Sequence, residues 1–424
     1  MDSPDQGAFG LATTQTKFSD NKLEIMLENM GIQYSGVLEG NHLKGTFTQG
    51  GTVFELNLSR NEISKEVQKT RPQDPIKPYG YQSENVYFTN DKANNIKLAG
   101  TLTLPKNIKN PPVVIMISGS GPQNRDEEIA VFNHRPFLVW SDYLTKNGIA
   151  VLRYDDRGVA ESEGSQENAT SADFATDVEA AVNYLKTRKD IDRDKIGLIG
   201  HSEGGFIAPM VAFSKKENKV NKDIAFIVLL AGTGVDGGEV LTSQARRAAE
   251  LAGATTEELD FNEILSNKIF DIVKIETDSE KLKTKLANLL HETKTNGPAA
   301  LTKDITNESI KAQIKILSSK WFGYFIRTNP NDFLSEVSCP VLAINGEKDF
   351  QVLADLNLNG IKDSLKKANN NDVTIKKMPS LNHLLQTAQT GAADEYKKIE
   401  ETVSPKALKL VADWINIRFG VTGQ

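Results

Sequence analysis

The sequence has almost no cysteine and no long apolar run. Cys339 is the only cysteine among 424 residues, so no disulfide can form within the chain. It precedes an apolar segment, which favours a buried structural thiol over a nucleophile. The five histidines do not cluster with cysteines, so the spacing of a metal site is missing, and neither a metal nor another cofactor is expected. No hydrophobic stretch approaches the ~20 residues that a membrane span needs.

The chain also lacks an excess of basic residues. Its net charge is -6, and lysines and glutamates are mixed along its length, which argues against a nucleic-acid partner. The opening stretch MDSPDQGAFG has neither the basic nor the apolar region of a signal peptide, which indicates a cytoplasmic protein unless the chain is a trimmed form of an exported one. The length suffices for one large core and one or two smaller units.

Residues 1–70 alternate in the manner of β-strands. Leu23, Ile25 and Leu27 share one face, as do Phe54, Leu56 and Leu58, and turn signals stand at 39–41 and 49–51. This pattern predicts a small antiparallel β-domain of about four strands. Three prolines follow within seven residues, at 72, 75 and 78, which makes 71–82 a semi-rigid linker and the best domain boundary.

From about residue 83 the pattern changes to strands alternating with helices. Short apolar runs stand at 113–118, 149–154, 196–200, 224–232 and 340–346, with amphipathic segments between them. Continuous apolar strands of this kind belong to a parallel sheet covered on both faces, so residues 83–234 and 336–424 are predicted to form a doubly wound α/β domain. Residues 235–335 hold helical stripes without a convincing strand, and we expect them to form a helical cap.

The run at 196–200 leads into Gly200-His201-Ser202-Glu203-Gly204, which has the form G-x-S-x-G. Small residues two before and two after the serine let a strand turn sharply into a helix, with the serine exposed in a strained conformation. An apolar strand before the motif and an apolar helix after it supply the context that this motif requires. We therefore predict that Ser202 is a nucleophile.

A serine nucleophile needs a base, and the base needs a group that orients it. His383 follows a strand-like segment near the C-terminus, from where an imidazole can reach back over Ser202, and it is the preferred base. The other histidines are less suitable: His42 in a turn of the β-domain, His134 before an apolar helix, His201 within the motif and His291 on a cap helix. Asp349, in the loop after the strand at 340–346, is the preferred acid, with Glu347 as its rival.

Two backbone N–H groups should stabilise the oxyanion. One is that of Glu203, the residue after the nucleophile. The other is expected from the glycine-rich loop after 113–118, from Ser120 or alternatively from Gly121. Gln123 in the same loop and His134 beyond it are candidates for lining the site.

Four ordered elements resemble the α/β-hydrolase superfamily over residues ~83–420: the glycine-rich loop 119–122, the triplet Asp156-Arg157-Gly158, the 200–204 motif, and the Asp349/His383 pair. SGSGPQNRDE together with GHSEGG is similar to bacterial esterases of the serine aminopeptidase-like or prolyl-oligopeptidase-like branch, which carry a helical cap. The resemblance implies Ser202, Asp349 and His383 as a catalytic triad. One departure is Ser118-Gly119, where many relatives have His-Gly, which removes a usual supporting side chain.

The front segment resembles a β-domain that precedes such esterases, where DSPDQGAFG and GTFTQGG lie inside the domain rather than at its start. That resemblance implies that residues 1–70 are a truncated domain of an exported, periplasmic protein. A role of this domain in binding carbohydrate or in forming a homodimer stays open, although Tyr34, Phe47 and Phe54 alternate like core residues.

The leading hypothesis is a cofactor-independent serine carboxylesterase that hydrolyses small or medium acyl esters through an acyl-enzyme. A second is a serine aminopeptidase, for which cap carboxylates such as Glu257, Glu258 and Asp260 would bind a substrate amine. A thioesterase or a carbohydrate-acetyl esterase would use the same chemistry. A binding protein with a degenerate hydrolase fold is the non-enzymatic alternative.

Overall fold

The computed structural model describes residues 13–27, 32–49, 52–60, 71–214, 219–303 and 305–420. Backbone contacts divide the chain into two compact units. The larger comprises residues 70–129, 134–270 and 320–424, and the smaller comprises 1–69, 130–133 and 271–319. This grouping divides the segment 235–335, which we expected to form one cap, between the two units.

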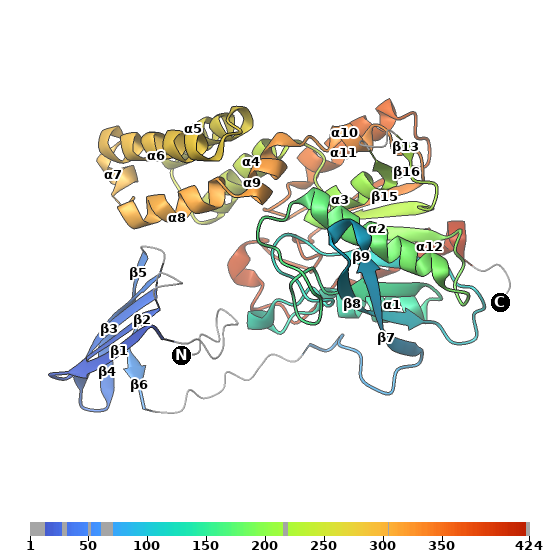
Figure 1. The fold of residues 1–424 in the computed structure, drawn as a ribbon, viewed down its shortest axis with the longest axis horizontal. Helices are drawn as coiled ribbons and strands as arrows, with labels where there is room; N and C mark the ends of the chain where they lie inside the picture. Colours follow the sequence, from blue (N-terminus) through green and yellow to red (C-terminus); the bar gives the residue numbers. More distant parts are fainter. Residues whose placement is uncertain are drawn as a thin grey trace. The chain divides into compact units, whose positions relative to one another are not determined.

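The larger unit is built on an eight-stranded sheet with the order β16-β15-β14-β11-β9-β10-β8-β7 (Figure 1). The strands are β7 (Gln82–Asn90), β8 (Ile96–Leu104), β9 (Val113–Ile117), β10 (Ala150–Tyr154), β11 (Ile196–His201), β14 (Phe226–Leu230), β15 (Val341–Gly346) and β16 (Val373–Met378). The last six run parallel, and they are the six strands that the apolar runs and the segment before His383 indicated. The mostly parallel α/β architecture expected from the sequence is confirmed.

The hairpin of β7 and β8 was not expected from the sequence. The two strands pair antiparallel from Gln82↔Leu104 to Asn90↔Ile96, and β8 also pairs antiparallel with β10. The reversal between them uses Asn94 and Asn95, both with positive φ, a conformation that asparagine tolerates better than most residues. The hairpin therefore places an antiparallel edge on a sheet that is otherwise parallel.

Helices cover both faces of the sheet because successive strand residues point to opposite sides. Val114 and Met116 pack with α1 (Pro136–Lys146) and α12 (Pro405–Phe419) on one face. Val113, Ile115 and Ile117 pack on the other, against α2 (Ser171–Thr187), α3 (Glu203–Ala212) and α11 (Ala354–Lys367). Helix α12 begins at Pro405, directly after its N-cap residue Ser404.

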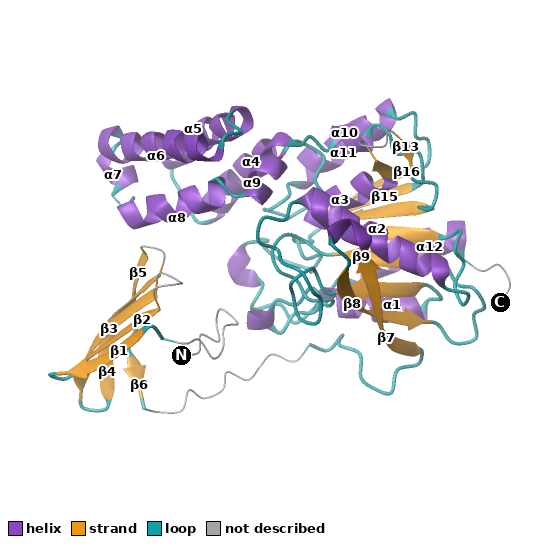
Figure 2. Cartoon of the chain, in the orientation of Figure 1, coloured by secondary structure: helices purple, strands orange, loops and turns teal. Residues whose placement is uncertain are grey.

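Between β14 and β15 the described residues form helices joined by loops, without a strand (Figure 2). Its helices are α4 (Gly237–Leu251), α5 (Thr256–Ile275), α6 (Ser279–Asn296), α7 (Ala299–Thr302), α8 (Asn307–Leu317), α9 (Lys320–Arg327) and α10 (Asn331–Leu334). One of the helical stripes expected in this segment is the buried face of α6, formed by Leu282, Leu286 and Leu290. No helix of the described residues is both long and apolar enough to cross a membrane.

The smaller unit carries an antiparallel sheet of β1 (Gln15–Ser19), β2 (Lys22–Leu27), β3 (Ile32–Glu39), β4 (His42–Gln49) and β5 (Thr52–Glu55), in that order. A sixth strand, β6 (Leu58–Ser59), pairs with β4, so the sheet has more strands than the four expected. The turn expected at 39–41 joins β3 to β4. The stretch DSPDQGAFG and Gly50-Gly51 lie outside the described residues, and truncation of this domain stays a prediction.

The junction between β11 and α3 is packed too closely for side chains. A Cβ on Gly200 would fall on the carbonyl of Gly204, and one on Gly204 would fall on the carbonyl of Ile117 in β9. A Cβ on Gly205 would lie 2.6 Å from the Cα of Gly232. The glycines therefore allow α3 to start directly against two neighbouring strand ends.

This packing predicts that Gly204→Ala destabilises the larger unit. The new methyl group would have to displace the backbone of β9, and overpacking of this kind costs about 1–3 kcal/mol in free energy of unfolding. Urea denaturation followed by circular dichroism measures the loss. Gly80→Ala is the matched control, because nothing lies within 4 Å of the position of its Cβ. Equal stability of the two variants would contradict the argument.

Candidate functional site

Ser202 lies at the turn from β11 into α3, as the 200–204 motif predicted. Its φ of 52° and ψ of −115° are unusual for a residue with a side chain, and such strain is typical of functional positions. The backbone is held on both sides, since the Ser202 N–H donates to the Leu230 carbonyl and its carbonyl accepts from the Gly205 N–H, both at 2.9 Å. The turn thus fixes the place of the serine.

His383 and Asp349 lie together, although 34 residues separate them in the chain. Nδ1 of His383 is 2.8 Å from Oδ2 of Asp349, and both side chains are buried. The other carboxylate oxygen of Asp349 accepts from the N–H groups of Gln351 and Val352 at 2.8 and 2.9 Å. A carboxylate held in this way orients the imidazole. Because Nδ1 faces Asp349, Nε2 is the ring nitrogen that remains for a catalytic role.

The rival groups for these two positions are engaged elsewhere. Glu347 accepts from the Ser380 N–H at 3.0 Å through its side chain. His134 is fully buried, with Nε2 2.9 Å from the Thr402 carbonyl, and burial lowers its pKa to about 4. That contact ties the loop before α1 to the segment before α12, which is a structural role rather than the lining role considered from the sequence. His42 and His291 are exposed.

The glycine-rich loop after β9 passes directly beside the serine. A Cβ on Gly119 would lie 3.3 Å from the Cβ of Ser202. The Gly119 N–H is already bound to Glu127 at 2.7 Å, which leaves Ser120 and Gly121 as the candidate donors of this loop. Gly121 has φ of 92°, and the amide of Gln123 approaches the Ser120 carbonyl at 3.5 Å.

The second expected donor is the N–H of Glu203. Glu203 is the first residue of α3, where a backbone N–H has no acceptor within its own helix. Its side chain is buried and accepts from Ser171 Oγ at 2.6 Å and from Trp321 Nε1 at 2.8 Å. Burial raises the pKa of this carboxyl. The side chain therefore joins α2 and α9 to the motif, while the N–H at the start of α3 stays available to a ligand.

Asp156 supplies the support that the Ser118-Gly119 pair seemed to lack. Ser118 Oγ donates to its Oδ1 at 2.8 Å, and the Gln123 N–H donates to its Oδ2 at 3.1 Å. One carboxyl group thus holds both ends of the loop from 118 to 123. Burial raises the pKa of Asp156 to about 8. Ser118 and Asp156 follow neighbouring strands, which was the one sequence signal for this contact.

Glu127 and His201 form a second buried pair that sequence reasoning missed. Oε1 of Glu127 lies 2.8 Å from Nδ1 of His201, and Nε2 of His201 lies 3.1 Å from the His383 carbonyl. From the sequence, His201 is only a less suitable base than His383. Glu127 lies in a loop with no periodic pattern, 74 residues before His201. No motif or sequence spacing therefore predicted the contact.

Other chemistries find little support in the described part of the chain. No group of three or more histidine, cysteine, aspartate or glutamate side chains is placed to hold a metal ion there. Cys339 is free and packs against the core on one face of the large sheet, and burial raises the pKa of its thiol to about 12. A thiol with that pKa is a poor nucleophile at neutral pH.

The chain is similar to several known proteins. A family model described as serine aminopeptidase, S33, matches residues 137–316. Esterase EstD of Thermotoga maritima is 24% identical over 384 residues, which span 85% of this chain and 78% of that protein. An uncharacterized protein of Pseudomonas aeruginosa, PA2218, is 25% identical over 208 residues, or 47% of this chain and 54% of its own length.

Solved structures of low sequence identity also align with the chain. The crystal structure of PA2218 covers 82% of this chain and 98% of its own, with a TM-score of 0.48 and 16% identity. A structure of the Pyrococcus furiosus esterase PF2001 covers 80% of this chain and 92% of its own, with a TM-score of 0.46 and 16% identity.

The environment of Asp156 predicts a pH-dependent effect of Asp156→Asn on stability. The ordinary pKa of this carboxyl is near 4 and the folded value is about 8. Between these values the folded protein keeps a proton that the unfolded chain has released, so the contribution of Asp156 to stability falls as the pH rises. Asparagine does not titrate. The free energy of unfolding of the variant relative to the parent should therefore increase from pH 5 to pH 8.

The change is on the order of 1 kcal/mol per pH unit within that window. Urea denaturation of both proteins at pH 5, 6.5 and 8 measures it. A difference that stays constant across the three pH values would show that Asp156 is already ionised at pH 5.

Proposed function

This chain belongs to the α/β-hydrolase superfamily and is a hydrolase, and from that premise we propose that it is a serine carboxylesterase with Ser202, His383 and Asp349 as its catalytic triad. The observation that carries the proposal is the buried hydrogen bond between His383 Nδ1 and Asp349 Oδ2, at 2.8 Å. The sharp turn at Ser202 supports it, because the strained backbone presents a serine at the end of a parallel strand.

The mechanism follows from the direction of that hydrogen bond. Asp349 accepts a hydrogen bond from Nδ1–H, so the neutral imidazole keeps a lone pair on Nε2 and can take the proton of Ser202 Oγ. The serine oxygen then forms a bond to the ester carbonyl carbon. His383 returns the proton to the departing alkoxide, which leaves as an alcohol. A water molecule, activated by the same histidine, hydrolyses the acyl-enzyme and releases the acid.

The negative charge on the substrate oxygen would be stabilised by the N–H groups of Ser120 and Glu203. Gly119 lies against Ser202, and its own N–H is occupied by Glu127, so the following amide, that of Ser120, is the better placed of the loop donors. The Glu203 N–H lies at the start of α3, where the helix dipole also favours negative charge. Gly121 remains the alternative to Ser120.

We propose esters of small or medium acyl groups as the substrates. The similarity to a protein named esterase supports an ester over an amide. The family model is described by a peptidase, and this keeps an aminopeptidase as the second candidate. Thioesters and acetylated carbohydrates would be cleaved by the same steps.

The contacts of the cap carboxylates considered for amine binding favour an ester substrate over a peptide. Glu257, Glu258 and Asp260 lie on the first turns of α5, and all except Glu258, which is half-buried, are exposed. Glu258 accepts from the Thr255 N–H at 2.7 Å, and Asp260 is 3.3 Å from Arg246. Asp260 is therefore already neutralised by an arginine, and Glu258 caps its own helix, which leaves little in this group to recognise a substrate amine.

Removal of the nucleophile should abolish hydrolysis without unfolding the protein. Ser202→Ala is expected to lose all measurable turnover of p-nitrophenyl butyrate. Asp349→Asn should lower kcat about 10⁴-fold, because the imidazole is no longer held in the right tautomer. Glu347→Gln is the matched control, since glutamine keeps an acceptor for the Ser380 N–H, and it should keep near-normal activity. Full activity of Ser202→Ala would sink the proposal.

The two candidate substrate classes are separated by parallel assays on the purified protein. We expect kcat/KM for p-nitrophenyl acetate and butyrate to exceed that for aminoacyl p-nitroanilides by at least about 10²-fold, which corresponds to nearly 3 kcal/mol in transition-state binding. An acyl-thioester series measured alongside tests the thioesterase alternative. A preference for the anilides would establish the peptidase instead.

A further inference from the structure

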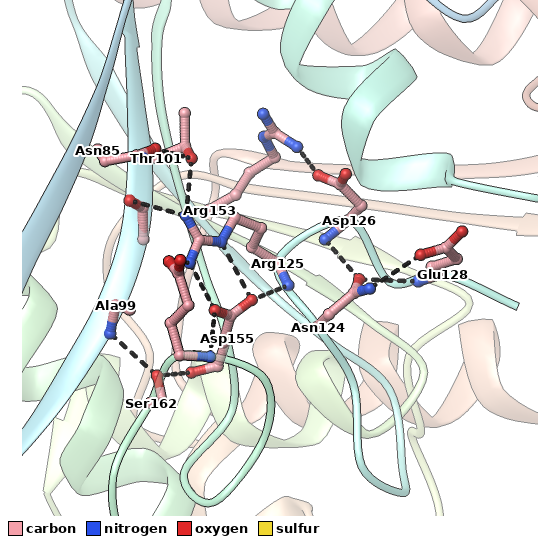
Figure 3. A network of polar contacts seen from close by, with 12 residues as sticks. Asn85, Ala99, Thr101, Asn124, Arg125, Asp126, Glu128, Arg153, Asp155 and Ser162 are labelled. Atoms are coloured by element: carbon pink, nitrogen blue, oxygen red, sulfur yellow. Dashed lines mark hydrogen bonds and ion pairs between the residues drawn. The ribbon is translucent and has the colours of Figure 1, made fainter. Parts of the chain in front are cut away.

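The loop between β9 and α1 is tightly braced although it has little regular structure. Arg125 binds Asp155 through Nε at 3.1 Å and through its terminal nitrogen at 2.6 Å, and it also reaches the Gly100 carbonyl and Thr101 (Figure 3). Arg153 pairs with Asp126 from the strand beneath. These contacts flank Glu127 on its N-terminal side and fix the loop where that residue turns inward.

Glu127 itself adopts an uncommon backbone conformation, with φ of 51°. A non-glycine residue in this region is worth attention because the conformation carries a cost that the surroundings must offset. The side chain is buried, with 7% of its surface exposed, and it points toward β11 rather than toward solvent. Its neighbour Glu128 instead accepts from the Asn124 amide at 3.0 Å and is only partly buried.

One oxygen of Glu127 joins two parts of the site. Oε1 accepts from the Gly119 N–H at 2.7 Å and lies 2.8 Å from Nδ1 of His201. On its other side the His201 ring lies 3.1 Å from the His383 carbonyl through Nε2. A continuous chain of hydrogen bonds therefore runs from the glycine-rich loop, through Glu127 and His201, to the backbone of His383.

The protonation of the His201 ring follows from the groups that face its two nitrogens. The His383 carbonyl can only accept, so Nε2 of His201 carries a proton, and Nδ1 faces the carboxylate of Glu127. Both ring nitrogens then donate, which makes His201 an imidazolium paired with a buried carboxylate. Burial opposes this charge, but the charge and hydrogen bond of Glu127 outweigh burial, helped by the His383 carbonyl and by Asp349, so the pKa of His201 is raised. The remaining titratable neighbours are His134 and the ring of His383, whose centroid is 4.9 Å away.

We infer that Glu127 and His201 are a positioning pair for hydrolysis, which holds the loop of the Ser120 donor at one end and the backbone of His383 at the other. The inference rests on the proposed function, in which the loop donor stabilises the substrate oxygen and His383 transfers the serine proton. Together the two side chains carry no net charge, so they brace the site without adding a negative charge beside the developing oxyanion. Glu127 and His201 act only through their contacts with the Gly119 N–H and the His383 carbonyl, and neither Glu127 nor His201 is assigned a chemical step.

The pair is tested by Glu127→Gln and His201→Asn in the full-length protein, with Glu128→Gln as the matched control. Glutamine keeps an acceptor for the Gly119 N–H but removes the counter-charge of His201. We expect kcat for p-nitrophenyl butyrate to fall at least about 10-fold in both variants, with KM within about threefold of the parent, because the loss lies in the alignment of the transition state. The double variant should be no slower than the slower single variant, as coupled residues require. Glu128→Gln should stay within about twofold.

A second readout does not depend on activity. With ¹⁵N-labelled histidine, both ring nitrogens of His201 should stay protonated to a higher pH in the parent protein than in Glu127→Gln, because the variant lacks the charge of Glu127. A purely structural role would lower the thermal midpoint without this change in protonation and without the split between kcat and KM.

The outcomes separate the two proposals. A parent protein that hydrolyses no ester and whose Ser202 does not react with a fluorophosphonate contradicts the proposed function. An active parent with an equally active Glu127→Gln variant, or with a His201 ring that loses its proton at the same pH in both proteins, overturns the positioning pair alone. If Glu127→Gln does not fold, the protonation of His201 in the parent and the kinetics of His201→Asn decide the matter.

Discussion

The close packing at the start of α3 is the constraint on which the rest of the site depends. There is no room for a side chain at Gly200, Gly204 or Gly205, because each Cα lies against the backbone of a neighbouring element. The helix can therefore begin immediately after β11, and the chain reverses through Ser202 at φ of 52°. The loop after β9 lies beside the serine, and the loop after β14 lies beside Gly205. Both approach closely because no side chain stands between the backbones. Backbone packing at the strand ends therefore positions the site independently of its charged groups.

Four carboxyl groups surround this turn, and they are stabilised in two different ways. Asp349 and Glu127 each face a ring nitrogen of a histidine at hydrogen-bond distance. Asp156 and Glu203 are held by uncharged donors instead, and burial raises the pKa of both. An uncompensated pair of buried carboxylates would oppose an oxyanion. Raised pKa values reduce that charge, and so the groups can serve as hydrogen-bonding anchors near neutral pH.

The sequence was sufficient for what is local or ordered along the chain. The six parallel strands followed from apolar runs, and the position of Ser202 at the end of β11 followed from glycines two before and two after it. The proximity of His383 to Asp349 followed from both residues standing in loops after adjacent strands. By contrast, Glu127 and Arg125 stand in an irregular loop, and their partners are chosen by three-dimensional packing. The β7–β8 hairpin was missed because alternating, half-exposed strands resemble surface segments when read singly.

The bond from Trp321 to Glu203 links the helical segment between β14 and β15 with the motif that carries the serine. Glu203 lies 118 positions before Trp321. Its side chain accepts from the indole N–H of Trp321, and its own backbone N–H is the one at the start of α3. Glu203 therefore has two roles: its carboxyl group holds α9, and its backbone N–H is proposed to bind the substrate oxygen. Homologous sequences that replace the indole should change residue 203 together with it, because a buried carboxyl that loses a donor is costly to keep. Diversification of the helical segment is then constrained at this point by the nucleophile motif, so the two regions are expected to evolve as coupled rather than independent parts.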